Sequence, residues 1–165
     1  MNHLWAPWRM QYVTTADAQD GCVFCALGQQ QPDGGNGLLA RAPHNFVVLN
    51  AFPYNSGHMM VVPYEHQSDF TALTPEALQE MVRLAQVAVA VLQEEFHCEG
   101  ANLGLNLGKV AGAGIKDHLH LHIVPRWGGD TNFMAVLGDV RVIPQSLAEL
   151  HDLLRRTAAK LRLPR

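Results

Sequence analysis

Hydrophobic positions along this 165-residue chain follow two periods, that of a strand and that of a helix. Short apolar runs with β-branched residues at Phe46–Leu49 and His58–Val62 predict two strands. The sequence NAFPYNSG between them is a turn rich in asparagine, proline and glycine. Further on, ANLGLNLG alternates as a strand does, KVAGAGIK is a glycine-rich connection, and HLHLHIV predicts a further strand.

Two later segments carry the spacing of amphipathic helices. The first begins with Thr-Pro-Glu at 74–76, which supplies a hydroxyl cap, a proline at the first helical position and an acidic residue at the positive end of the helix dipole. Its apolar residues follow at helical spacing: Leu78, Met81, Val82, Ala85, Val89, Leu92 and Phe96. The second is predicted to begin at Ser146, where Ser146 and Glu149 form a capping box.

The order of these elements is strands, helix, paired strands, helix. The two strands after Gly100 are close enough in the chain to form an antiparallel hairpin, which favours an α+β fold over a doubly wound parallel sheet. We therefore expect one domain with a mainly antiparallel sheet of about five strands and two principal helices.

Composition narrows the class of protein. Hydrophobic residues make up 48% of the chain and charged residues 16%, which is typical of a globular domain. The net charge of −3 gives no support for a broad nucleic-acid or membrane-binding surface. The first residues lack the apolar core of a signal peptide, and no apolar run approaches the ~18 residues of a membrane span. Three cysteines make no disulfide framework, so a cytoplasmic protein is expected.

Three histidines stand at alternate positions in DHLHLHIVPRWGGD: His118, His120 and His122. In a strand this spacing places the three imidazoles on one face and the aliphatic residues on the other. Such a row is a polar outer face, a set of metal ligands, or a nucleophilic imidazole flanked by two that orient it and bind phosphate. An outer face usually mixes several polar residue types, so the first alternative fits least well.

The pair Cys22-x-x-Cys25 also has three interpretations: a redox pair, half of a zinc site, or coincidence in a helical turn. A zinc site needs two further ligands. Cys98 has no evident partner.

The segments HLHLHIV, GHMMVVP and PRWGGD together resemble the histidine triad (HIT) family, and the resemblance extends over nearly the whole chain. It implies an enzyme in which the middle histidine, His120, attacks the α-phosphate of a nucleotide and forms a nucleotidyl-histidine intermediate. His122 would contact the phosphate and the leaving group, and His118 would orient the triad or bind a metal.

The resemblance also implies nucleotide contacts. Asn50 corresponds to a ribose-binding position, His58 to the rim of the active site, and Asn106 to a phosphate contact beside the triad. The loop Gly108–Gly114 would offer main-chain N–H groups to an anion. Many HIT proteins carry glutamine or serine where this chain has Gly114. The nucleotide-binding residues expected are therefore Asn50, His58, Asn106, Gly112, Gly114 and Trp127, with Lys109 and Arg126 as the nearest basic residues.

In the zinc-bearing branch of the family and in the related hexose-1-phosphate uridylyltransferases, a CxxC pair is completed by two histidines. This chain has His66 in VVPYEHQ and the first triad histidine at the matching positions. The resemblance therefore implies a structural zinc site formed by Cys22, Cys25, His66 and His118. Such a site would tie the N-terminal segment to the triad and fix the backbone that aims His120.

LWAPWRMQYV, HIVPRWGGDTNF with Trp127, and VRVIPQSL resemble the bacterial branch of diadenosine tetraphosphate phosphorylases, or ATP adenylyltransferases. Those enzymes transfer AMP to inorganic phosphate, so the expected products are ADP and ATP. The alternatives are a dinucleoside polyphosphate hydrolase, a nucleoside phosphoramidase, or a zinc-stabilised nucleotide-binding protein without turnover.

The expected organisation is a single domain: an N-terminal segment at 1–40, a core at 41–127 and a C-terminal extension with a helix at 128–165. The resemblance further implies a homodimer formed through the long helix at 74–96 and a sheet edge. The expected partners are a nucleotide substrate and inorganic phosphate, with no nucleic acid and no membrane.

Overall fold

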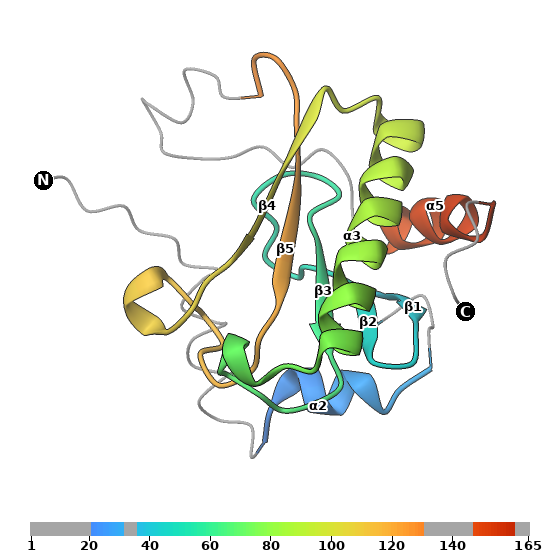
Figure 1. The fold of residues 1–165 in the computed structure, drawn as a ribbon. Helices are drawn as coiled ribbons and strands as arrows, with labels where there is room; N and C mark the ends of the chain where they lie inside the picture. The colour runs from blue at the N-terminus through green and yellow to red at the C-terminus, as the bar shows by residue number, and fades with distance from the viewer. Residues whose placement is uncertain (1–20, 32–35, 131–146, 161–165) are drawn as a thin grey trace, which may run out of the picture.

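A computed structural model describes residues 21–31, 36–130 and 147–160 of the chain. Five strands form one antiparallel sheet in the order β1-β2-β3-β5-β4 (Figure 1). The strands are β1 (Leu38–Arg41), β2 (Asn45–Leu49), β3 (Met59–Pro63), β4 (Gly100–Leu105) and β5 (Leu121–Arg126). The α+β fold with an antiparallel sheet of five strands is therefore confirmed, as is the β4–β5 pairing.

Two helices cover one face of the sheet. α3 (Pro75–Phe96) begins as expected, because the Thr74 side chain accepts a hydrogen bond from the Ala77 amide. Its buried stripe, with α5 (Leu147–Lys160), packs on alternate residues of the central strands such as Val61 and Ile123. The predicted cap at Ser146 lies outside the described residues.

The opposite face carries a smaller helix, α2 (Val23–Gly28), which lies below the sheet in Figure 1. Phe24 of this helix packs into a second buried cluster with Leu38, Phe46, Val48, Met60 and Val62. Neither α2 nor β1 is predicted by the sequence pattern. Two short single-turn helices, at Phe70–Ala72 and Lys109–Ala111, complete the described elements.

The histidine row is less regular than its spacing predicts. β5 begins at Leu121, so His122 lies in the strand, whereas His118 and His120 precede it. The expectation of a single strand carrying all three is therefore wrong. Phe24 nevertheless contacts the rings of both His118 and His120, with centroids 5.4 and 5.1 Å away, so the two imidazoles share the α2 side of the sheet. His122 pairs with Met60 on β3 and with Gly104 on β4.

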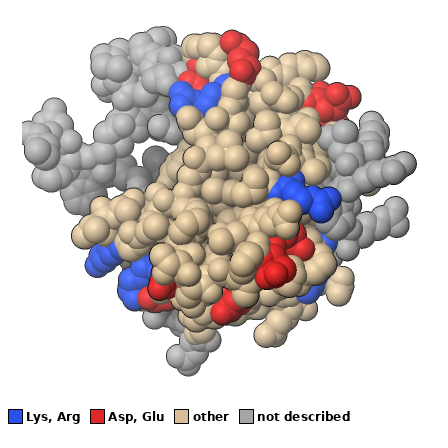
Figure 2. Space-filling model, in the orientation of Figure 1, with Lys and Arg blue, Asp and Glu red and all other residues tan. Residues whose placement is uncertain are grey.

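The surface shows no single dominant charge on the face drawn in Figure 2. Lysine and arginine side chains there are few and stand beside acidic ones. Within the described residues, no helix combines the length and apolar character that crossing a bilayer requires. The segments LWAPWRMQYV and VRVIPQ lie outside the described part of the chain.

Candidate active site and metal cluster

His120 is buried and held in one orientation by its own segment of chain. Its Nδ1 lies 2.9 Å from the main-chain oxygen of His118, which can only accept, so Nδ1 carries the proton. The lone pair of the neutral ring is then on Nε2. Burial lowers the pKa of His120, and the hydrogen bond to the His118 carbonyl offsets this only in part. The lowered pKa favours the neutral ring at neutral pH. The acceptor is the main-chain carbonyl two residues before His120 in the same segment.

His122 is oriented from its other side by His58. The main-chain N–H of Tyr54 donates to His58 Nδ1 at 3.1 Å, so the proton of a neutral His58 is on Nε2. That Nε2 lies 3.0 Å from His122 Nδ1, which must therefore accept. His122 is left with its own proton on Nε2. These two hydrogen bonds form a chain of donors that ends in the Nε2–H of His122.

The electrostatics of this pair favour neutral rings. Burial, with the charges of His122 and His120 adding to it, lowers the pKa of His58 to about 3. Burial and His120 likewise lower the pKa of His122 to about 4. The rings of His120 and His122 meet edge to face at a centroid distance of 4.8 Å, so the lone pair of one and the N–H of the other serve one site.

His58 reaches this position because of the turn that precedes it. Gly57 has a φ of +82°, and a Cβ there would lie 2.8 Å from Leu92 Cδ2 of α3. Only glycine allows the turn to approach the helix so closely. The ring of Tyr54 stacks on His58 at 4.8 Å and covers its other side.

Four side chains form a metal-ligand cluster: Cys22, Cys25, His66 and His118. Their ligand atoms all lie within 4.8 Å of one another. The Sγ atoms of Cys22 and Cys25 are 3.2 and 3.6 Å from His118 Nδ1, and Cys25 Sγ is 3.3 Å from His66 Nδ1. Tetrahedral zinc with such ligands needs separations of about 3.3–3.8 Å between donor atoms, so the cluster fits the ion with small adjustments.

The proton on His118 is also placed correctly for a ligand. His118 Nε2 lies 2.8 Å from the main-chain oxygen of Pro63 and must donate to it. Nδ1 is therefore unprotonated and faces the two thiols. A histidine that binds a metal usually donates its other ring N–H to a carbonyl or carboxylate, which fixes its tautomer. The structure thus brings together the four residues named from the sequence as a set that could hold a metal.

The residues expected to contact the nucleotide lie in two places, one beside His58 and the other in the glycine-rich loop after β4. Asn50 closes β2, accepts from the Phe52 amide at 2.9 Å and lies 3.4 Å from the His58 ring. The Asn106 amide reaches the Gly112 carbonyl at 3.5 Å and so braces the glycine-rich loop. Gly112 has a φ of +91° and its N–H bonds to Lys109, while Gly114 lies further along the loop and is exposed.

Trp127 is not brought to the triad. It stands five residues after His122, roughly 16 Å along an extended chain, and packs against the core on the α3 side. Its indole N–H donates to the Phe96 carbonyl at 3.0 Å. Arg126 pairs with Asp130 rather than pointing to the histidines. In this structure Trp127 anchors the end of β5 to the end of α3.

Sequence reasoning missed several residues that shape the site. Phe24 lies between the two cysteines and contacts both His118 and His120, yet the CxxC pattern gives no reason to select it. Tyr54 and the carbonyl of Pro63 act through main-chain atoms, which any residue type provides. The aromatic ring within the NAFPYNSG turn was the one available signal for Tyr54.

Comparisons with known proteins agree with this geometry. The family model described as "HIT domain" matches residues 36–129. AP-4-A phosphorylase of Mycobacterium tuberculosis (strain H37Rv) is 39% identical over 162 residues, covering 93% of this chain and 83% of that protein.

Two solved structures illustrate the likeness in fold. A Zn-bound histidine triad family protein from Mycobacterium smegmatis superposes with a TM-score of 0.69 and 31% identity, covering 86% of this chain and 95% of that chain. The diadenosine triphosphate hydrolase of Plasmodium falciparum has a TM-score of 0.61 at 16% identity, covering 81% of each chain, and is similar in fold alone.

Proposed function

Since this chain belongs to the HIT family, we propose that it is a nucleotidyltransferase that acts on dinucleoside polyphosphates through His120. The observation that carries the proposal is the orientation of His120, whose Nδ1–H is bound to the His118 carbonyl and whose Nε2 lone pair is therefore available. A neutral, fixed imidazole is a good nucleophile towards phosphorus.

In the proposed reaction, His120 Nε2 forms a bond to the α-phosphorus. The bond from phosphorus to the leaving oxygen breaks, and the electron pair departs with that oxygen. His122 would donate its Nε2–H to an oxygen on which negative charge develops, because His58 holds its other nitrogen as an acceptor. A second nucleophile then attacks the nucleotidyl-histidine and restores His120.

The nucleotide would lie along the segment that carries His120 and His122, between the turn that follows β2 and the loop that follows β4. We propose that Asn50 contacts the ribose and that Asn106 and the loop containing Gly112 and Gly114 contact the phosphates. The amides of Ala111, Gly112 and Ala113 donate within the loop, so a main-chain contact with an anion would come from other amides of the loop, such as that of Gly114. Trp127 would support this site indirectly, through the core.

We propose zinc as the ion of the Cys22, Cys25, His66 and His118 cluster. Two cysteines and two histidines with all four ligand positions filled by protein are typical of structural zinc and leave no open position for substrate. The metal would fix the segment that carries His118, whose carbonyl orients His120. The similarity to a Zn-bound relative supports this identification.

The preferred reaction is phosphorolysis of diadenosine tetraphosphate, because the relative that is 39% identical is an AP-4-A phosphorylase. Product analysis with this substrate, with and without inorganic phosphate, tests it. ADP plus ATP formed only when phosphate is present supports phosphorolysis. AMP plus ATP at a rate that ignores phosphate would replace it with hydrolysis, and binding without any protein–AMP adduct would remove the enzymatic function altogether.

A further inference from the structure

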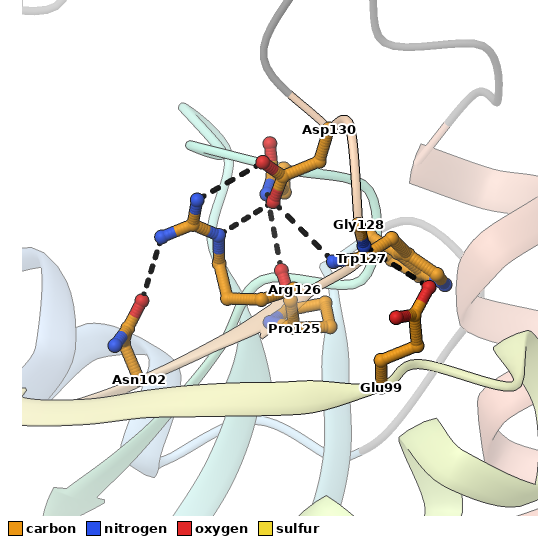
Figure 3. A network of polar contacts seen from close by, with 8 residues as sticks. Glu99, Asn102, Pro125, Arg126, Trp127, Gly128 and Asp130 are labelled. Carbon is orange, nitrogen blue, oxygen red and sulfur yellow. Dashed lines mark hydrogen bonds and ion pairs between the residues drawn. The ribbon is translucent and has the colours of Figure 1, made fainter.

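A polar network at the end of β5 joins the two segments that carry His58 and His122 (Figure 3). Asn55, in the loop between β2 and β3, donates its side-chain amide to the Pro125 carbonyl at 3.0 Å and to Asp130 Oδ2 at 3.1 Å. Pro125 is three residues beyond His122 on the same strand. One side chain therefore ties the loop that holds His58 to the strand that holds His122.

Asp130 is built into this network as a fixed acceptor. Arg126 donates to both of its carboxylate oxygens, and the Trp127 amide lies 3.4 Å from Oδ2. Asn102 on β4 accepts from the other end of the same guanidinium at 2.9 Å, as the dashed lines in Figure 3 show. The Asp130 side chain is only 11% exposed. These contacts hold the carboxylate where Asn55 must meet it.

Asn55 is directly connected to the orientation of His58. Its carbonyl accepts from the His58 amide at 3.1 Å and closes the turn. The residue before it, Tyr54, supplies the N–H that occupies His58 Nδ1. A hydrogen bond weakens steeply as its distance and angle depart from the ideal. A shift of the turn would therefore break the bond from the Tyr54 amide to His58 Nδ1, and His58 would no longer be restricted to one tautomer. His122 would then lose its fixed donor.

We propose that Asn55 and Asp130 are positioning residues for the His58–His122 pair, keeping the loop and β5 in the register that directs the Nε2–H of His122 into the site. The proposal rests on the proposed function only for its catalytic consequence. Its structural part concerns the tautomer of His58 and can be tested without any substrate. Neither residue touches the reacting atoms.

The first experiment measures the tautomers directly. Ring ¹⁵N shifts of His58 and His122 in histidine-labelled protein should show a single neutral form in each, protonated on Nε2. In Asn55→Ala and in Asp130→Ala we expect His58 to become a mixture of tautomers. Glu99→Ala is the matched control, because Glu99 holds the Gly128 amide at the same end of β5 without touching Asn55. An unchanged His58 signal in both variants, or an equal change in the control, would overturn the proposal.

The second experiment asks whether the pair matters for the leaving group. The substrates are aryl esters of AMP whose phenols range from acidic to weakly acidic. The Nε2–H of His122 matters most when the leaving phenol is only weakly acidic, because more negative charge then has to be stabilised on its oxygen. Asp130→Ala should therefore lower kcat about ten-fold or more for the least acidic phenol and only about two-fold for the most acidic, with KM nearly unchanged. Equal losses across the series would contradict positioning of His122.

The two experiments also separate this inference from the proposed function. If wild-type protein forms no adduct with any ester, the nucleotidyl-transfer proposal fails, while the ¹⁵N result still decides whether Asn55 and Asp130 set the tautomer. Should Asn55→Ala be too unstable to examine, Asp130→Ala carries both measurements, because it removes the acceptor and leaves the turn sequence intact.

Discussion

At the residue scale, the site depends on which nitrogen of each histidine carries a proton. A main-chain group fixes one ring nitrogen in each of three histidines. His120 donates to the His118 carbonyl, His118 donates to the Pro63 carbonyl, and His58 accepts from the Tyr54 amide. Main-chain groups cannot change their donor or acceptor character, so the tautomers are set by the fold and not by mutual adjustment.

A first prediction separates His120 from His122. His120→Ala should abolish the protein–AMP adduct and reduce turnover by a factor of about 10³ or more, because it removes the nucleophile. His122→Gln should reduce turnover by about 10²-fold and still form adduct, because it removes a donor. Nucleotide affinity should stay within a few fold in both. Labelling with a radioactive dinucleotide measures the adduct, and a labelled His120→Ala protein would refute the mechanism.

A second prediction concerns pH and stability. The pKa of His58 is lowered from the ordinary 6.5 to about 3, and that of His122 to about 4. At a pH below 6.5 and above these lowered values, the two histidines therefore bind more protons in the unfolded chain than in the folded one. Stability from this pair is therefore complete above about pH 6.5 and is lost as the pH falls towards 4. In His58→Gln, the free energy of unfolding that is lost on acidification should be smaller by on the order of 1–2 kcal/mol.

Denaturant unfolding at pH 7 and pH 4.5 measures this effect as a difference between wild type and variant. Using the difference is necessary because the cysteine and histidine cluster also takes up protons when metal is lost. Identical pH dependence in the two proteins would mean that His58 is charged as readily in the folded state as in the unfolded state.

At the scale of elements, α2 is the one whose position needs an explanation beyond packing. The helix spans only six residues, Val23–Gly28, and the capping residue before it, Cys22, makes no side-chain hydrogen bond to the helix N-terminus. A helix this short is not stable by itself. Phe24 in the second buried cluster and the two cysteines beside His66 and His118 hold it against the sheet.

Loss of the metal should therefore loosen α2 first. Cys25→Ser is expected to lose bound zinc, from about one ion per chain, and to lower the melting temperature by about 10 °C. Elemental analysis and thermal unfolding check both. Cys98→Ala is the control, since Cys98 is a buried cysteine of the main core and not of the cluster. Wild-type protein that contains no metal would leave the cysteines as packing residues of α2.

The helices and strands differ in how well the sequence predicts them. α3 and the four longer strands were predicted because their apolar spacing or capping residues are local features of the chain. β1 has only four residues and no alternation, and α2 has neither a cap nor two full turns, so neither has a local pattern to detect. Within the site, the triad is visible as a repeated motif and the cysteines as a CxxC pair, whose histidine partners come from the family resemblance. Tyr54, Asn55 and Asp130, in contrast, act through contacts that form only on folding.

For the whole molecule, the two edges of the sheet differ. β1 is covered by α5, whose buried His151 bonds to the Leu38 carbonyl at 2.9 Å. β4 pairs with β5 alone among the described strands, and its Leu103 is 50% exposed. On α3, Val82 is 57% exposed. We therefore expect the homodimer implied by the family resemblance to form through β4 and α3.

Light scattering at micromolar concentration tests this expectation. Leu103→Arg should shift the protein from dimer to monomer, because it places a charge on the apolar part of the edge. Val110→Arg should not, because Val110 lies in the loop beyond β4 and outside the expected interface. A monomeric wild-type protein would remove the dimer while leaving the fold as described.

The double use of His118 has a consequence for how the protein can change over evolutionary time. Its ring belongs to the metal cluster, but its contribution to His120 is a main-chain carbonyl, which every amino acid possesses. A lineage can therefore discard the imidazole at this position without disorienting the nucleophile, provided that something else secures the segment. Cys22, Cys25 and His66, which serve the metal cluster alone, should be inherited or lost as a set, whereas His120 should persist in every descendant that retains turnover.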